Sequence, residues 1–556
     1  MLKKIQKTGN RLRYPDAEEN SLRRELLPPV RVMWRSEAVK DAEMLMRSME
    51  IQPFVNAEAV VCTLPPGAGI MLDYGTELHG GIRIVCSRSD QGVNRVRIRF
   101  GESASEAMSE PDNDHMLHDT ELELPSHGMV SYGHTGFRFL RLDVSPEAKG
   151  DVLLYGVFAE AVYRDLAYVG EFSCSDERLN RIWQTGAYTV HLNMQDYIYD
   201  GIKRDRMVWL GDLNPEIRVI AAVFDDNTAV PASLDFVRDR TPPGVPMNGT
   251  SSYSAWWVIS HYDWYLYRGD LVYLRRQHDY LITVIRQLSE YVGPDGSERF
   301  TATRFFDWSS ADHPAAVHAG LQGLLVWAFA AGEKICLALS DPENAARCAD
   351  CRRRLLQHCP SSGNSKQAAA IQATAGFGDP CKINAEILAP NPCSGLSTFT
   401  GYYVLEARAM AGDYAGALDV IRRYWGGMLD AGATTFWEDF DLGWLENSNR
   451  IDELPIPGKK DIHADFGAHC YQGLRHSLCH GWAGGPTAWL SECLLGITPL
   501  EPGFKTARIQ PRLVDLDWLE GVMPTPYGPI RVTAEKQRDN QIRCDIQVPS
   551  AVQLHK

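Results

Sequence analysis

The densest cluster of residues with chemical potential lies between Tyr199 and Asp212. Acidic residues, basic residues and glycines are interleaved there with an indole ring: Asp200, Gly201, Lys203, Arg204, Asp205, Arg206, Trp209, Gly211 and Asp212. Such carboxylates can transfer protons or bind hydroxyl groups, and a tryptophan can stack on a sugar ring. A solvated, charge-paired loop is the structural alternative. The interleaved glycines and tryptophan favour a pocket, because they bring close backbone approach and a stacking surface to the acids.

A second cluster lies between Gly432 and Asp441, where Glu438 directly follows Trp437. A lone glutamate is usually exposed on the surface. An acid pressed against tryptophan would instead lose its water, which raises the pKa and suits general acid–base work. His480 can either donate to a ligand hydroxyl or serve as a structural histidine. Trp256, Trp257 and Trp264 share one predicted helix and are better assigned to the core, with Tyr253 a weaker candidate for a pocket rim.

A third pattern has the residue types of a zinc site: Cys348, Cys351, His358 and Cys359. All four lie in one strongly helical stretch. In a helix, only Cys348 and Cys351 would share a face with His358 or Cys359. Structural zinc sites use other ligand spacings. We therefore predict no metal and no cofactor.

Three regions with different secondary-structure patterns follow one another along the chain, and together they must position these clusters. Residues 54–170 favour short strands, as in Val93–Phe100, where Val96, Ile98 and Phe100 alternate with arginines. Helical periodicity then begins near Ser175 and dominates to about 495. The predicted helices are 175–195, 215–225, 252–268, 270–292, 320–339, 341–358, 398–411, 414–428 and 484–495. From about residue 500 the pattern returns to strands.

This order predicts a multidomain protein in which a helical barrel is flanked by antiparallel β-sandwich domains. The predicted boundaries are 1–170 for a β-sandwich with a preceding irregular segment, 171–497 for the helical domain and 498–556 for a short β-domain. Roughly a dozen helices fit a toroid of paired helices, the (α/α)6 barrel. A helical solenoid fits equally well by helix count, although no repeat of its usual length is visible.

Composition excludes several classes of partner. The 56 basic and 71 acidic side chains give a net charge of −15, which disfavours binding to nucleic acid or to anionic lipid. No apolar run approaches the roughly 20 residues that cross a bilayer, and the N-terminal residues do not read as a secretory signal. The 13 cysteines then suggest reduced thiols in a cytoplasmic protein. The 14 tryptophans fit either a large core or sugar-binding platforms.

These residues resemble the α-L-rhamnosidases of glycoside hydrolase family 78, and the resemblance extends from about Leu72 to about Pro511. The family hallmark Gly-Ala-Thr-Thr-x-Trp-Glu is matched from Gly432 to Glu438. The hallmark Asp-x-Pro-x-Arg-Asp-Glu-Arg-x-x-Trp-x-Gly-Asp corresponds to 200–212, which is one residue shorter and lacks the Glu. Gly-Asp-Trp is echoed at 306–308, and Asn-His-Tyr-Ala weakly at 479–482.

The resemblance implies an (α/α) barrel, β-sandwiches and an inverting mechanism with two carboxyl groups. When the hallmark is anchored on Trp209 and Asp212, Asp205 takes the position of the general acid with a side chain one methylene shorter. Glu438 would be the general base. The substrate-binding residues implied are Asp200, Arg204, Trp209, Asp212, Asp307, Trp308, Trp437 and His480, with Trp482 as a further contact. The charges of Asp200 and Asp212 should also keep Asp205 protonated by like-charge repulsion.

The function predicted from these residues is removal of terminal α-L-rhamnose from small glycosides or oligosaccharides, without a cofactor. Two alternatives stay open because the acid position is altered. The chain could be a related glycosidase that acts on a different sugar, or a non-catalytic carbohydrate-binding relative. We also predict a cytoplasmic location and no nucleic-acid or membrane partner. The sequence is compatible with a homo-oligomer.

Overall fold

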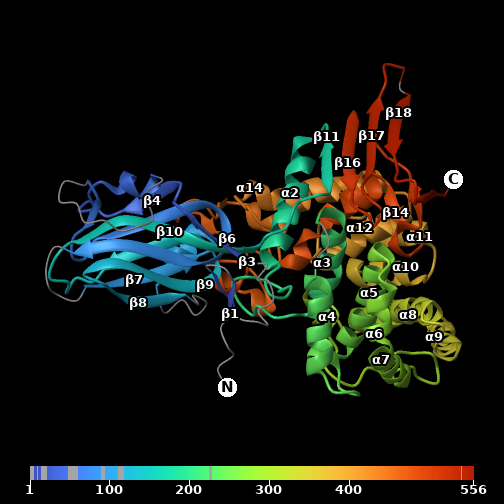
Figure 1. Ribbon diagram of the computed structural model, residues 1–556. Helices are drawn as coiled ribbons and strands as arrows, with labels where there is room; N and C mark the ends of the chain where they lie inside the picture. The colour runs from blue at the N-terminus through green and yellow to red at the C-terminus, as the bar shows by residue number, and fades with distance from the viewer. Residues whose placement is uncertain are drawn as a thin grey trace.

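The computed structural model describes residues 6–8, 11–13, 22–47, 60–88, 94–110, 118–224, 228–539 and 541–555. Parts of the N-terminal segment and of the strand predicted at Val93–Phe100 lie outside these ranges. In Figure 1 a sheet built from the first third of the chain lies beside a helical region, and a second, smaller sheet stands on the helices. The succession of sheet, helices and sheet is the predicted one.

The first sheet has eight strands in the order β3-β10-β6-β9-β7-β8, with β4 on β6 and β5 on β10. Its alternating side chains enclose one core, in which Val96, Ile98 and Phe100 are at most 2% exposed. Arg99, on the opposite face, is also buried because it pairs with Asp143. The strands are β3 (Leu22–Leu27), β4 (Arg31–Arg35), β5 (Cys62–Leu64), β6 (Gly69–Arg88), β7 (Asn94–Gly101), β8 (Asp119–Leu124), β9 (His127–Val144) and β10 (Val152–Arg164).

Helices occupy most of the chain from residue 177 to residue 494. The longer ones are α2 (Glu177–Asn193), α3 (Leu210–Val223), α4 (Ala229–Arg240), α5 (Ser251–Arg268), α7 (His278–Glu290), α8 (Pro314–Ala338), α9 (Pro342–Leu355), α10 (Lys366–Ala375) and α12 (Gly401–Met410). Shorter ones are α1 (Ala104–Met108), α6 (Leu271–Arg276), α11 (Pro380–Ile383), α13 (Tyr414–Val420), α14 (Gly426–Asp430) and α15 (Gly485–Trp489). The predicted helices are present in this list, and α1, α4, α10 and α11 lie outside the predicted ranges.

Two helix starts differ from the prediction. α3 begins at Leu210, so Pro215 stands inside the helix and not at its first turn. α8 begins at Pro314, six residues before the predicted start, because Pro314 fits the first position of a helix. By length and composition, α8 alone among the described helices could cross a membrane, yet 78% of its most apolar window is buried inside the protein.

The smaller sheet joins segments from both sides of the helical region. β11 (Glu171–Cys174) pairs with β16 (Trp518–Met523), which is followed by β17 (Ile530–Lys536) and β18 (Ile542–Gln547), all antiparallel. A three-stranded sheet contains β14 (Ile497–Pro499), β15 (Thr506–Ile509) and β19 (Gln553–Leu554). In it β15 and β19 are parallel, which corrects the prediction of purely antiparallel sheets. Two further pairs are β1 (Gln6–Thr8) with β2 (Arg11–Arg13) and β12 (Ser448–Asn449) with β13 (Lys460–Asp461).

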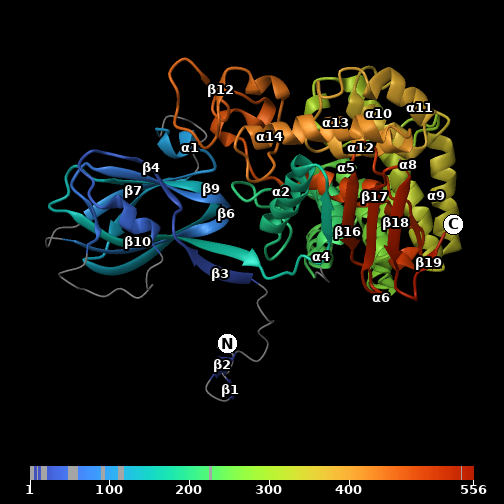
Figure 2. The ribbon, with the colours of Figure 1, turned by 90° about the horizontal axis from the view of Figure 1, so that it is seen from above.

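The eight-stranded sheet contacts the loops of the helical region directly. Figure 2 shows the segment around β12 lying beside α1, the short helix that follows β7. There the Ala104 backbone N–H donates to the Ile451 carbonyl at 2.8 Å, and the Glu77 backbone N–H donates to Thr434 Oγ1 at 2.9 Å. The sheet is thus packed against the chain segment that carries the second predicted cluster.

Candidate active site

An open pocket of about 190 Å³ lies where several loops of the helical region meet. The lining comes from the 200–212 segment, the start of α5 and loops far apart in the sequence: Asp200, Arg204, Asp205, Trp209, Asp212, Thr250, Tyr253, Thr303, Phe305, Trp308, Glu438, Tyr471, His480 and Trp482. The two clusters seen in the sequence therefore face one cavity.

Asp205 enters the pocket from a tight turn. Asp205 and Arg206 both have left-handed backbones, with φ of 53° and 51°, and the Arg206 N–H donates to the Arg204 carbonyl at 2.6 Å. Aspartate tolerates this conformation better than most residues. In this turn the Asp205 side chain is 36% exposed.

Glu438 is buried and firmly held. Its Oε2 accepts hydrogen bonds from Arg204 Nη2 and, at 3.2 Å, from the Ser477 N–H. Its backbone carbonyl accepts bonds from Thr398 Oγ1 at 2.6 Å and from Trp482 Nε1 at 3.0 Å. These contacts leave Oε1 as the oxygen that faces His480, whose Nδ1 is 3.8 Å away.

Arg204 connects the two predicted catalytic carboxylates. Its Nη1 lies 3.4 Å from Asp205 Oδ2, and its Nη2 pairs with Glu438 Oε2. Because one guanidinium contacts both groups, the two contacted oxygens lie no more than about 8 Å apart. Arg204 is itself fixed by donation from Nε to the Arg475 carbonyl at 2.9 Å. Two carboxyl groups separated by one buried cation can each transfer a proton independently, one as an acid and the other as a base.

Asp200, Asp212 and His480 form the floor of the pocket. Asp200 accepts a bond from the Met207 N–H at 2.9 Å, and His480 Nε2 lies 2.9 Å from Asp212 Oδ1. Burial raises the pKa of Asp200 and of Asp212 well above the usual value, and it lowers the pKa of His480 to about 4. The expectation that Asp200 and Asp212 act on Asp205 through their full negative charge is therefore wrong, since burial favours their neutral forms.

Aromatic rings make the walls. Trp209 meets Tyr253 edge-on with ring centroids 5.8 Å apart, and Trp308 lies 5.0 Å from Phe305. Tyr471 and Trp482 complete the walls. Thr250, Thr303, Phe305 and Tyr471 were not found from the sequence, because no motif surrounds them. Their only signal is their position at the ends of predicted helices or in the loops between them.

Two predicted residues, Asp307 and Trp437, are not among those that line the pocket. Asp307 Oδ2 accepts bonds from the Ser397 and Thr400 hydroxyls, and Asp307 caps the turn at Trp308–Ser310. Trp437 is fully buried, with its ring against Phe440. Trp437 is thus part of the core, whereas Glu438 lines the pocket.

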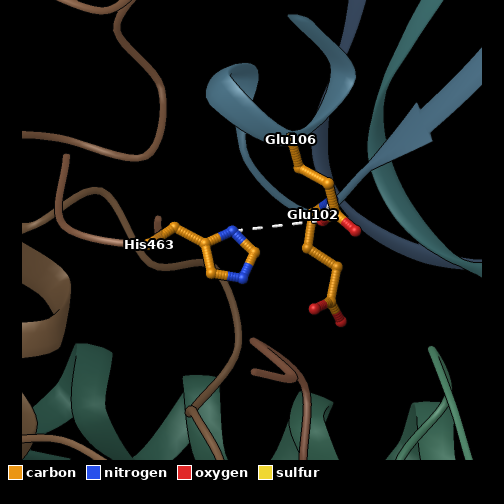
Figure 3. Close-up of side chains that lie close together, drawn as sticks. All are labelled: Glu102, Glu106 and His463. Carbon is orange, nitrogen blue, oxygen red and sulfur yellow. Dashed lines mark hydrogen bonds and ion pairs between the residues drawn. The ribbon is translucent and has the colours of Figure 1, made fainter. Parts of the chain in front are cut away.

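One group of described residues has the composition of a metal site. Ligand atoms of Glu102, Glu106 and His463 lie within 4.8 Å of one another, as Figure 3 shows. Both nitrogens of His463 already have partners, however: Ser103 Oγ at 2.7 Å from Nδ1 and the His476 carbonyl at 2.9 Å from Nε2. A buried ammonium, that of Lys203, lies 2.8 Å from Glu106 Oε1. These contacts fit an ion-paired cluster better than a metal site.

The described cysteines are free thiols, and those predicted not to bind zinc do not form a cluster of three ligands. Cys348 and Cys351 are buried in the core, whereas Cys359 is exposed. Trp256, Trp257 and Trp264 are at most 3% exposed, which confirms their assignment to the core.

Comparison with known proteins finds similar domains in two parts of the chain. Residues 167–326 match the bacterial alpha-L-rhamnosidase six-hairpin glycosidase domain, and residues 496–555 match the bacterial alpha-L-rhamnosidase C-terminal domain. A curated alpha-L-rhamnosidase from Alteromonas sp. (strain LOR) is 25% identical over 519 residues, covering 84% of this chain and 53% of that protein. The chain thus spans about half the length of this curated relative.

Solved structures share the fold. A family 78 rhamnosidase of Bacillus sp. GL1 gives a TM-score of 0.72 at 22% identity and covers 92% of this chain and 55% of its own. A rhamnosidase from Klebsiella oxytoca with rhamnose bound gives 0.67 at 22% identity and covers 85% and 96%. The domain matches and the curated relative show that this chain is similar to bacterial alpha-L-rhamnosidases, and the solved structures show that it shares the fold of a family 78 rhamnosidase.

Proposed function

We propose that this protein is an inverting glycoside hydrolase that removes terminal α-L-rhamnose from small glycosides. The observation that carries the proposal is the placement of Asp205 and Glu438 on one pocket, with Arg204 between them. Inverting glycosidases hold their two carboxyl groups about 6.5–9.5 Å apart, which leaves room for a water molecule. The upper limit of about 8 Å set by the shared guanidinium is compatible with that spacing.

In the proposed reaction Asp205 gives its proton to the glycosidic oxygen as the C–O bond to the anomeric carbon breaks. A water molecule attacks the anomeric carbon from the opposite face and loses a proton to Glu438. Arg204 and Ser477 occupy Oε2 of Glu438, so Oε1 is the oxygen that takes this proton. His480, neutral at physiological pH, and the protonated forms of Asp200 and Asp212 can donate hydrogen bonds to sugar hydroxyls.

Three wider features belong to the same proposal. The helical region is proposed to be an (α/α)6 barrel with the pocket at the end that carries the 200–212 and 471–482 loops. The aromatic walls suit the methyl group of a 6-deoxy sugar. Free thiols throughout the described chain support a reducing compartment such as the cytoplasm, where small imported glycosides would be the substrates.

Hydrolysis of 4-nitrophenyl α-L-rhamnopyranoside tests the proposal. Asp205→Asn and Glu438→Gln should each lower kcat/KM by about 10²-fold or more, because each removes a proton transfer of the reaction. The matched control is Asp515→Asn, which alters a half-exposed aspartate paired with Arg422 on the surface and should leave kcat/KM unchanged.

The outcomes separate the alternatives. If Asp205→Asn and Glu438→Gln both match the wild type, the site is wrong. If the wild type cleaves another nitrophenyl glycoside instead, the sugar is wrong. If it cleaves none of them but binds rhamnose in calorimetry, the protein is a non-catalytic carbohydrate-binding relative.

A further inference from the structure

The residue before Arg204 is a buried lysine that joins two parts of the molecule. Lys203 is 1% exposed. Its ammonium group lies 2.8 Å from Glu106 Oε1, on α1, and 3.4 Å from Glu102 Oε2, in the turn between β7 and α1. The same group donates hydrogen bonds to the carbonyls of Leu474 and, at 3.0 Å, His476. All three donors of the ammonium can therefore be used.

The loop at 474–478 that Lys203 binds is also the loop that holds Glu438. The Ser477 N–H donates to Glu438 Oε2 at 3.2 Å, and the Glu438 N–H donates to the Ser477 carbonyl at 3.0 Å. Glu102 binds this loop as well, since its Oε2 accepts a bond from the Leu478 N–H at 2.6 Å. Lys203 and Glu102 thus bind the loop backbone on both sides of Ser477, the residue that contacts Glu438.

The turn that carries Asp205 is anchored to the eight-stranded sheet. The Gly136 N–H, on β9, donates to the Ile202 carbonyl at 2.9 Å, and Thr135 Oγ1 donates to the Lys203 carbonyl at 3.3 Å. Arg206 donates to the His134 carbonyl. The left-handed turn at Asp205 and Arg206 thus follows directly on a segment that is anchored at Ile202 and Lys203.

We propose that Lys203, held by Glu102 and Glu106, is a positioning residue that sets the placement of Asp205 relative to Glu438. This inference rests on the proposed function. It gives the segment that follows β7 a part in catalysis, because this segment supplies the carboxylates that hold Lys203 next to both the acid turn and the loop behind the base. A displacement of about 1 Å in such a pair can cost about 10²-fold in rate.

Lys203→Met tests this role, because methionine keeps most of the side-chain volume and removes the ammonium. The fold can tolerate the loss of charge: burial already raises the pKa of Glu102 to about 8, and it raises that of Glu106 too, so both carboxyls can take up a proton. The matched control is Lys366→Met, a lysine 9% exposed whose Nζ donates to the Ser394 carbonyl and which does not line the pocket.

We expect Lys203→Met to lower kcat on 4-nitrophenyl α-L-rhamnopyranoside by at least about tenfold, with KM within about threefold of wild type. The loss should be larger still on methyl α-L-rhamnopyranoside. Methoxide is a much more basic leaving group than nitrophenolate, so its departure depends more strongly on the proton from Asp205. A purely structural lysine would not produce this dependence on the leaving group. Lys366→Met should retain wild-type kcat on both substrates.

If Lys203→Met does not fold, the double variant Lys203→Met/Glu106→Gln removes one positive and one negative charge together and is measured in the same way. Equal losses on both substrates, or a loss no greater than that of Lys366→Met, overturn the inference while the wild-type activity upholds the proposed function. A wild type that cleaves neither rhamnoside overturns the function and this inference with it.

Discussion

Arg204 is the side chain on which the proposed chemistry depends most. It contacts both candidate catalytic carboxylates and is anchored to the Arg475 carbonyl. Its planar guanidinium can bind two groups in fixed directions, which lysine cannot do. Asp205 lines the pocket from a turn in which two consecutive residues, Asp205 and Arg206, have left-handed backbones.

A pH-dependent stability change is expected from Asp439, the neighbour of Glu438. Burial raises its pKa from 3.8 to about 7, so between these values the folded state binds a proton that the unfolded state has released. This contribution is complete below pH 3.8 and is lost as the pH rises to 7. Asp439→Asn carries no charge at any pH and should be more stable than wild type by about 4 kcal/mol at pH 8.

Urea unfolding of wild type and Asp439→Asn at pH 3.5 and pH 8 measures this difference. At pH 3.5 both side chains are neutral in both states, so the two proteins should differ little. A stability gain of the same size at both pH values would show that packing, and not the proton, is responsible.

Residue-scale prediction from sequence succeeded where chemistry is concentrated in short segments. Asp200, Arg204, Asp205, Trp209 and Asp212 lie within 13 residues and line one pocket. Phe305 and Tyr471 could not be predicted, because they reach the pocket from loops 166 residues apart whose meeting depends on tertiary packing. Trp437 shows the converse: its motif was visible, but the direction of its side chain was set by the core around it.

At the scale of elements, α3 starts earlier than predicted, and it therefore carries the pocket residue Asp212. Because the helix begins at Leu210, Asp212 stands in its first turn, near the positive end of the helix dipole. Pro215 misled the prediction, since proline usually marks a first turn. Helix presence was predictable from the 3.6-residue periodicity, but this boundary depended on the Trp209 loop and its packing.

The close approach of α2 to the segment that follows His480 depends on two glycines. A Cβ at Gly186 would lie 2.3 Å from Thr487 Oγ1 and 2.9 Å from the Gly484 carbonyl. Gly186→Ala should therefore destabilise the protein by about 2 kcal/mol, despite the better helix propensity of alanine. Gly332→Ala in α8 is the matched control, because its Cβ would meet nothing closer than the Cys348 sulfur at 3.1 Å. Thermal unfolding of the two variants compares them, and a Gly186→Ala protein as stable as Gly332→Ala would contradict the packing account.

At the scale of the whole molecule, the order of sheet, helices and sheet followed from the change of period along the chain. The pairing of β11 with β16 did not, because it joins segments more than 340 residues apart and carries no local signal. The same holds for the contact between the segment that follows β7 and the base-holding loop, where Glu102 binds Leu478. The predicted boundaries at 170/171 and 497/498 remain predictions, and β11 shows that the second sheet draws on residues just past the first of them.

The central claim is that Asp205 and Glu438 act on opposite faces of one rhamnoside. Proton NMR during the first minutes of hydrolysis of an α-L-rhamnoside by the wild-type protein tests it most directly, because it observes the anomeric proton of the sugar before mutarotation. Direct attack by water assisted by Glu438 predicts that the β anomer of rhamnose appears first and the α anomer only later. Release of the α anomer first would contradict this account, since it would require a covalent intermediate and a second displacement.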